Sequence, residues 1–179
     1  MEPSDAVLVR AAKAGDGPSF GLLVARHYDR IYRLGYRVLG IRAEAEDLAQ
    51  DICAALPARL TSFRGEAAFT TWLHRLVLNA ARDRLRRQAA KARASDGWGE
   101  VEHARRAEAA EAHAAQAWLD AALAALPGDL RETVALVLGE DLTHAQAAEV
   151  LEISEGTVSW RMSEVRRRLR ALAEEELRA

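Results

Sequence analysis

The chain has 179 residues, half of them hydrophobic and only 6% aromatic, which excludes wholesale disorder and favours helices over β-sheets. A net charge of −2 would argue against a nucleic-acid partner, but basic residues concentrate in two windows, residues 75–93 and 161–170, on an acidic background. The composition therefore predicts an all-α protein and leaves nucleic-acid binding open.

The single cysteine, Cys53, excludes an internal disulfide and a cysteine metal cluster. The N-terminus lacks a positively charged start followed by an apolar core. No stretch approaches the roughly 18 apolar residues that a membrane span needs. We therefore expect a cytoplasmic protein.

Apolar residues recur at helical spacing through the first 93 residues. Pro18 helps to end the first helix, and Ser19 is expected to cap the second, which runs to Gly40. The third helix opens with acidic residues that suit a helix N-terminus, and its outer face stays acidic. The expected helices cover residues 5–14, 19–40, 43–60 and 69–93.

Residues 94–117 are rich in alanine, glutamate and arginine and have little to bury, which predicts a linker that is helical in part. A second domain begins near Trp118. Its further helices are expected over residues 130–138, 143–151 and 154–172. The sequence thus predicts two small helical domains, residues 1–93 and 118–179, joined by the linker.

The clearest motif spans the last two of these helices. Ala147 is small enough for a close helix crossing, Ser154 is placed to cap the second helix, and Val158, Met162 and Val165 form the inward face of that helix. This pattern predicts a helix-turn-helix; the alternative is an ordinary helical hairpin with a solvated basic end. Polar groups that suit base edges and phosphates lie on the outward face. They belong to Thr157, Ser159, Trp160, Arg161, Ser163, Glu164, Arg166, Arg167 and Arg168.

A second block, from Ser62 to Arg87, interleaves aromatic and basic side chains. Such a mixture suits an unstacked single strand, because bases stack on rings while arginines hold phosphates. The alternative is that Phe63, Phe69 and Trp72 are core residues and that the arginines form a solvated face.

Three sequence blocks in a fixed order make the chain similar to a known family. The first is Glu44-Ala-Glu-Asp-Leu-Ala-Gln-Asp, the second is Phe63-Arg-Gly-Glu followed by Thr71-Trp-Leu and Asn79, and the third is the helix-turn-helix with Gly156-Thr-Val. Together they resemble extracytoplasmic-function sigma factors of the sigma-70 family, over nearly the whole chain. The resemblance implies sigma region 2 in the first domain and sigma region 4 in the second.

The resemblance implies a bacterial transcription initiation factor that is not an enzyme and needs no cofactor or metal. Such a protein binds core RNA polymerase, recognises the −10 and −35 elements of promoter DNA and serves a stress- or signal-responsive regulon. It is held inactive by an anti-sigma factor, which can retain it at the inner membrane.

The resemblance also assigns contacts residue by residue. Core polymerase would be bound by Asp47, Leu48, Gln50 and Asp51. The −10 element would be held as a single strand with a flipped base by Phe63, Arg64, Ala67, Phe69, Arg75, Asn79, Arg82, Arg86 and Arg87. The −35 duplex would be read by Thr157, Ser159, Trp160, Arg161, Ser163, Glu164 and Arg167.

The second domain departs from the family at its reading positions. Relatives often carry a basic residue at the position of Ser159 or Glu164 and a small polar residue at that of Trp160, so we expect an unusual −35 preference. Arg161 is assigned either to a phosphate contact or to local packing. Glu152 stands at a turn position where glycine is usual, which predicts a slightly strained or differently shaped turn.

Two other functions remain as hypotheses. One is a stand-alone helix-turn-helix regulator, against which the aromatic and basic block argues because such a regulator needs no strand-melting domain. The other is a sigma-like scaffold whose main partner is a regulator. For the linker, the resemblance leaves both threading of the RNA exit path and passive tethering open.

Overall fold

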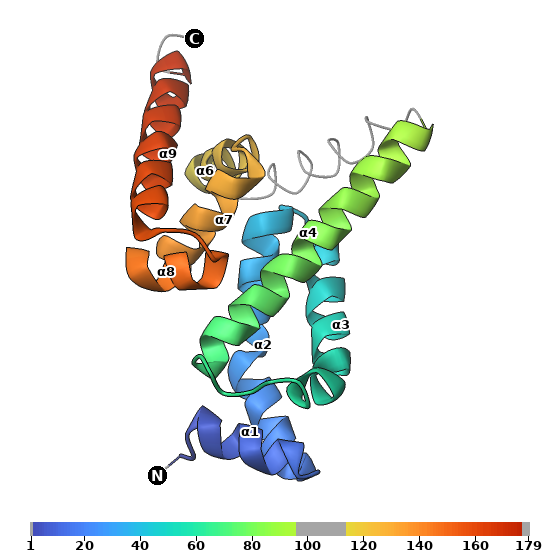
Figure 1. Ribbon diagram of the computed structural model, residues 1–179. Helices are drawn as coiled ribbons and strands as arrows, with labels where there is room; N and C mark the ends of the chain where they lie inside the picture. Colours follow the sequence, from blue (N-terminus) through green and yellow to red (C-terminus); the bar gives the residue numbers. More distant parts are fainter. Residues whose placement is uncertain (1, 96–113, 177–179) are drawn as a thin grey trace.

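The computed structural model describes residues 2–95 and 114–176, which form eight α-helices and no strand (Figure 1). The predicted all-α fold is confirmed. Most of the predicted linker, and with it the proposed threading of the RNA exit path, lies outside the described residues. The N-terminal bundle contains α1 (Asp5–Lys13), α2 (Gly17–Leu39), α3 (Arg42–Leu60) and α4 (Phe69–Ser95). The C-terminal bundle contains α6 (Ala114–Ala124), α7 (Gly128–Val137), α8 (His144–Leu151) and α9 (Glu155–Glu176).

The start of α2 differs from the sequence prediction. Asp16, rather than Ser19, is the N-cap: its carboxylate accepts a hydrogen bond from the Ser19 backbone N–H at 2.9 Å. Hydrogen bonding from the Ser19 side chain, and secondly from its backbone N–H, lowers the pKa of Asp16. Pro18 lies in the first turn of the helix, where its missing N–H costs no hydrogen bond. The prediction was wrong because it began the helix at Ser19, next to the first apolar residue, whereas the helix begins at Gly17, directly after Asp16.

The core of the N-terminal bundle is built on the apolar face of α3. Leu48, Ile52 and Leu56 recur every four residues and are 1%, 4% and 1% exposed. Leu48 lies directly against α2, where a Cβ atom on Gly35 would stand 2.9 Å from its Cδ2 atom. Burial of these side chains fixes which face of α3 stays in solvent.

The C-terminal bundle contains the predicted helix-turn-helix in α8 and α9. Thr143 caps α8 in a reciprocal capping box with Gln146, and the Thr157 N–H donates to Ser154 Oγ at 3.1 Å at the start of α9. Between the helices, Glu152 has a φ of 58°, the left-handed conformation that glycine adopts more readily. Of the two predicted alternatives, the structure supports the strained turn.

The predicted inward face of α9 is also confirmed. Val158, Met162 and Val165 are 0%, 2% and 1% exposed, and Ala147 on α8 is completely buried. These residues fix the rotation of α9, so the positions between them must point outward.

The two bundles pack against each other, an arrangement that we did not predict from the sequence. Figure 1 shows α7 beside α2 and α8 beside the start of α4, and the buried side chains of both bundles form one continuous cluster. Arg131 of α7 adds a polar link, donating from Nη1 to the Val38 carbonyl in the last turn of α2 at 3.1 Å. No helix among the described residues has the length and apolar character that a membrane crossing requires.

Candidate nucleic-acid interfaces

The outward face of α9 is the first candidate surface. Trp160 is 61% exposed although it is a large aromatic side chain. Ser159 and Ser163 flank it in solvent; His144 Nδ1 lies 2.9 Å from Ser159 Oγ, and Ser163 Oγ donates to the Ser159 carbonyl at 3.1 Å. The exposed side of the helix therefore presents one aromatic ring and two small hydroxyl groups. Side chains of this kind can contact base edges in a major groove.

The charged side chains of this face form ion pairs with one another within α9. Arg167 Nη2 and Arg168 Nε donate to Glu164 Oε1 at 2.6 and 2.7 Å, and Arg167 Nε donates to Glu164 Oε2 at 2.8 Å. These hydrogen bonds, with Arg167 first, lower the pKa of Glu164 to about 2. Glu164 therefore holds two arginines in place, and in this conformation three hydrogen bonds already occupy most of its acceptor sites.

Arg161 points away from the exposed face. Its side chain is 17% exposed, and its Nε atom lies 3.4 Å from Asp129 Oδ2 on α7. Nη1 donates to Thr133 Oγ1, also at 3.4 Å. Of the two roles that the sequence left open for Arg161, the structure supports local packing.

The loop between α3 and α4 and the first turn of α4 carry the aromatic residues of the second candidate surface, Phe63 in the loop and Phe69 and Trp72 in the helix. The Phe63 ring lies 5.2 Å from the Trp72 ring and 5.9 Å from the Phe69 ring, between centroids. Phe69 is only 6% exposed, whereas Phe63 and Trp72 are half-buried. Lys13 of α1 anchors the loop by donating to the Phe63 carbonyl at 2.8 Å. Phe69 is thus a core residue, and the partly exposed rings on which a base could stack are those of Phe63 and Trp72.

Arg75, Asn79 and Arg82 lie on one face of α4, and that face meets the C-terminal bundle. Arg75 Nη2 donates to the Glu149 carbonyl at 2.6 Å, and Arg82 donates to both carboxylate oxygens of Glu132 at 2.7 and 2.6 Å. The carboxamide oxygen of Asn79 accepts from Arg82 Nη1 at 3.1 Å. The structure brings these three predicted DNA contacts together, but in a state in which the other bundle engages both arginines.

The remaining predicted −10 contacts lie at the two ends of the block. Arg64 is 83% exposed in the loop, where Ala67 is half-buried, and Arg86 is 75% exposed further along α4. Arg86 pairs with Asp83, and Arg87 donates to the Asp83 carbonyl at 3.3 Å. Arg64, Arg86 and Arg87 are therefore accessible to a phosphate backbone.

The acidic face of α3 forms a third surface. Asp47, Gln50 and Asp51 are exposed, whereas Leu48 is buried and supports the helix from within. Arg84 of α4 fixes one edge of this face by donating to Glu44 at 3.0 Å and by pairing with Asp51. A carboxylate-rich, solvated helix face is suited to a basic protein partner.

A buried carboxylate at the boundary between the bundles was missed by sequence reasoning. Glu140 follows α7, its side chain is 3% exposed, and it accepts from Arg30 Nε at 3.0 Å and from Arg37 Nη1 at 2.9 Å. Burial opposes its ionisation, but His74, 3.5 Å away, and the two guanidinium groups outweigh burial and hold the pKa of Glu140 below its usual value. No local pattern reveals this cluster, because Arg30 and Glu140 are 110 residues apart.

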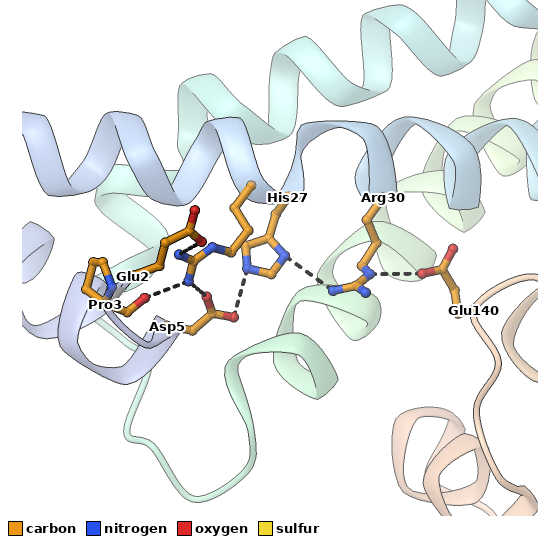
Figure 2. A network of polar contacts seen from close by, with 7 residues as sticks. Glu2, Pro3, Asp5, His27, Arg30 and Glu140 are labelled. Atoms are coloured by element: carbon orange, nitrogen blue, oxygen red, sulfur yellow. Dashed lines mark hydrogen bonds and ion pairs between the residues drawn. The ribbon is translucent and has the colours of Figure 1, made fainter.

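On the other side of Arg30 the network continues to the N-terminus (Figure 2). His27 is 3% exposed; its Nδ1 atom lies 3.4 Å from Arg30 Nη1, and its Nε2 atom lies 2.8 Å from Asp5 Oδ2. Because arginine can only donate, Nδ1 is the acceptor and Nε2 carries the proton that Asp5 accepts. Burial, opposed by Asp5, lowers the pKa of His27, so the imidazole is neutral at neutral pH.

Comparisons with known proteins agree with this geometry. Residues 23–91 match the sigma-70 region 2 family, and residues 116–169 match the sigma-70 region 4 family. Over 96% of its length, the chain is 35% identical to the ECF RNA polymerase sigma factor SigM of Mycobacterium tuberculosis, and the match covers 85% of that protein.

Solved structures show the same fold. The chain is similar to CnrH, solved in complex with the cytosolic domain of CnrY, with a TM-score of 0.72 and 27% identity over 96% of this chain and 97% of that one. It is also similar to RpoE of Bartonella quintana, solved in complex with the anti-sigma factor NepR, with a TM-score of 0.67 and 23% identity over 86% and 93% of the two chains. Likeness to RpoE supports the fold alone.

Proposed function

Since the chain belongs to the extracytoplasmic-function RNA polymerase sigma factors, we propose that its α9 face reads the −35 duplex and that its loop and α4 face capture the single-stranded −10 element. The protein is an alternative sigma factor and not an enzyme. Its DNA target is the promoter, and its protein partner is core RNA polymerase.

The observation that carries the proposal is the presence of two surfaces with different chemistry on one chain. The α9 face offers Trp160 and small hydroxyls on a helix that fits a major groove, which suits duplex DNA. The other surface combines the half-buried rings of Phe63 and Trp72 with arginines and with the carboxamide of Asn79. A ring replaces base stacking, and an amide offers a donor and an acceptor to a flipped base, which suits a separated strand.

The third surface supplies the link to polymerase. Asp47, Gln50 and Asp51 face solvent on α3, and Arg84 fixes Asp51 from α4. We assign this face to a basic surface of core polymerase, with Leu48 contributing through the core rather than by contact. A stand-alone helix-turn-helix regulator needs neither this face nor the single-strand surface, so it explains less of the chain.

Regulation and location follow as further parts of the proposal. CnrH, which is similar in sequence and fold, was solved with the cytosolic domain of a second protein, CnrY. We assign to this chain an anti-sigma factor as the regulator, a cytoplasmic location, and retention at the inner membrane when that regulator is membrane-bound.

Transcription in vitro tests the function. The protein is added to core RNA polymerase of its source bacterium with DNA fragments in which the −10 and −35 elements are randomised. We expect transcripts from a defined subset of fragments, at fixed start sites, and only when the protein is present. An Asp47→Arg, Asp51→Arg variant serves as the docking control and should yield none. If the wild-type protein gives no promoter-dependent transcript, the proposed function is wrong.

A further inference from the structure

The boundary between the two bundles covers part of the surface assigned to single-stranded DNA. Arg75 and Arg82 project from the same face of α4, seven residues apart, and both donate to acceptors of the C-terminal bundle. Arg75 also lies 3.7 Å from the carboxylate of Glu152. Before any DNA is present, the two arginines nearest to Asn79 therefore already have oxygen partners.

Glu132 of α7 binds the guanidinium group of Arg82 as a phosphate would. Two parallel N–H···O bonds of 2.7 and 2.6 Å join the guanidinium to the carboxylate, and the Glu132 side chain is only 8% exposed. These bonds raise the pKa of Arg82. A guanidinium binds a phosphate through the same pair of donors, so Glu132 and a DNA strand compete for one site.

A second contact closes the same boundary from the side of α2. Glu140 is held by Arg30 and Arg37, and Figure 2 shows Arg30 extended between His27 and Glu140. Gly139 makes room for this contact, since a Cβ atom there would lie 2.8 Å from Cδ and Cζ of Arg37. The Glu140 carboxylate is almost fully shielded from solvent. Removing or shortening one partner of such a buried ion pair weakens the contact more than it would at an exposed pair.

The α9 surface takes no part in this closure. Trp160 is 61% exposed and Arg167 67% exposed, and the hydrogen bonds of Glu164 stay within α9. Closing the boundary therefore hides a single-strand contact and leaves the duplex-reading helix in solvent.

We propose that the C-terminal bundle is an intramolecular inhibitor of the single-strand surface, held in place by Glu132 and Glu140. Glu132 is the competitor that fills the Arg82 site, and Glu140 is the clasp that keeps α7 on α2. The closed protein binds duplex DNA through α9, but it binds a separated strand weakly until the bundles part and free Arg82. This inference rests on the proposed function, which assigns the α4 face to the −10 strand.

The test measures DNA binding by the free, full-length protein. The probes are a fluorescein-labelled 20-nucleotide single strand of random sequence and a random duplex of the same length, and the readout is fluorescence anisotropy. The variants are Glu132→Gln, Glu140→Gln and the charge-conserving Glu140→Asp, whose shorter side chain cannot reach both Arg30 and Arg37. Glu175→Gln, at an exposed position of α9, is the matched control for the loss of one negative charge.

We expect Glu132→Gln, Glu140→Gln and Glu140→Asp to bind the single strand about tenfold more tightly than the wild type, because a larger fraction of molecules is open. Duplex affinity and the Glu175→Gln control should stay within about twofold of the wild type. Small-angle X-ray scattering should show a larger radius of gyration for both Glu140 variants. Circular dichroism at 222 nm confirms that each variant keeps its helices, and Glu132→Gln, which leaves the clasp intact, provides a second route if a Glu140 variant unfolds.

Two results would overturn the inference. In the first, the Glu140 variants expand in solution without any gain in single-strand affinity. In the second, only the charge-removing variants gain affinity while Glu140→Asp behaves as the wild type, which would make the effect one of charge rather than closure. Neither depends on promoter-dependent transcription, whose absence from the wild type would instead refute the proposed function.

Discussion

The two DNA-facing surfaces both carry arginines, but they differ in what holds those arginines. On α4, Arg75 and Arg82 are bound by residues of the other bundle, whereas on α9, Arg167 and Arg168 are bound by Glu164 of the same helix. A contact within one helix moves with that helix and leaves the surface open, but a contact between bundles covers it. The comparison shows that the chemistry of a surface and its accessibility are separate properties.

Removing one carboxylate from the boundary between the bundles and one from the α9 surface should expose this difference most strongly. Glu140→Ala leaves Arg30 and Arg37 without their buried acceptor and should lower the free energy of unfolding by about 3 kcal/mol. Glu164→Ala removes a pairing on a solvated helix and should cost less. Urea denaturation followed by circular dichroism measures both; a larger loss for Glu164→Ala would contradict the comparison.

Substitutions at two glycines, one at the boundary between the bundles and one in α9, test the same difference between the two regions without changing charge. A Cβ atom on Gly139 would lie 2.3 Å from the Ala135 carbonyl oxygen, so Gly139→Ala should destabilise the protein by about 2 kcal/mol. A Cβ atom on Gly156, at the start of α9, would meet nothing closer than Ser154 Oγ at 3.8 Å. Gly156→Ala should therefore be neutral or stabilising in a thermal melt, and equal losses at the two positions would count against close packing at the boundary.

Asn79→Ala separates strand capture from duplex reading. Loss of the carboxamide should reduce promoter opening about tenfold, the effect of losing one good contact to a base edge. Binding to the −35 duplex should be unchanged, since α9 lies on the other bundle. Permanganate reactivity of unpaired thymines measures opening, and a gel-shift assay with the duplex measures binding; an equal loss in both assays would refute the role of Asn79.

Trp160→Ala should change sequence preference rather than fold. The ring is exposed, so stability should hardly change, whereas the loss of one apolar contact in the major groove should alter discrimination at one base pair by about 1 kcal/mol. Selection of bound sequences from a randomised −35 duplex would reveal the change. An unchanged selection profile would remove Trp160 from the reading residues.

The smallest expected effect is a pH dependence of stability that arises at the N-terminal bundle. Burial lowers the pKa of His27, so the folded state binds fewer protons than the unfolded state at pH values below about 6.5. Stability should therefore fall as the pH decreases from 7.5 to 5.5, a range in which Glu140 stays ionised. His27→Gln should reduce this dependence in urea titrations at the two pH values, and an undiminished slope would assign it to other groups.

The sequence identified most of the local structure of both surfaces. Ser154 caps α9 as predicted, Val158 and Met162 are buried as predicted, and Glu152 adopts the predicted left-handed turn. Each feature depends on residues within one or two helical turns, so spacing alone reveals it. Capping of α2 was assigned to the wrong residue, because Asp16 and Ser19 are both good caps and only the hydrogen bond to Asp16 distinguishes them.

Contact roles were harder to predict than helices. Leu48 and Phe69 were assigned to partners, but they are 1% and 6% exposed. Arg161 was placed with the readers, with local packing as its alternative role, and its side chain packs on α7. In each case the residue lies within the right block, but the rotation of its helix about the core decides whether it faces a partner, and that rotation depends on packing.

By itself, the sequence determined the helices, the helix-turn-helix and the residue chemistry of the three surfaces, because periodicity, caps and composition act over short stretches of chain. Only the tertiary structure decided which of those surfaces is free. The ion pairs between Arg82 and Glu132 and between Arg30 and Glu140 join residues 50 and 110 positions apart. Such pairing depends on where the two bundles meet, and no local pattern encodes that position.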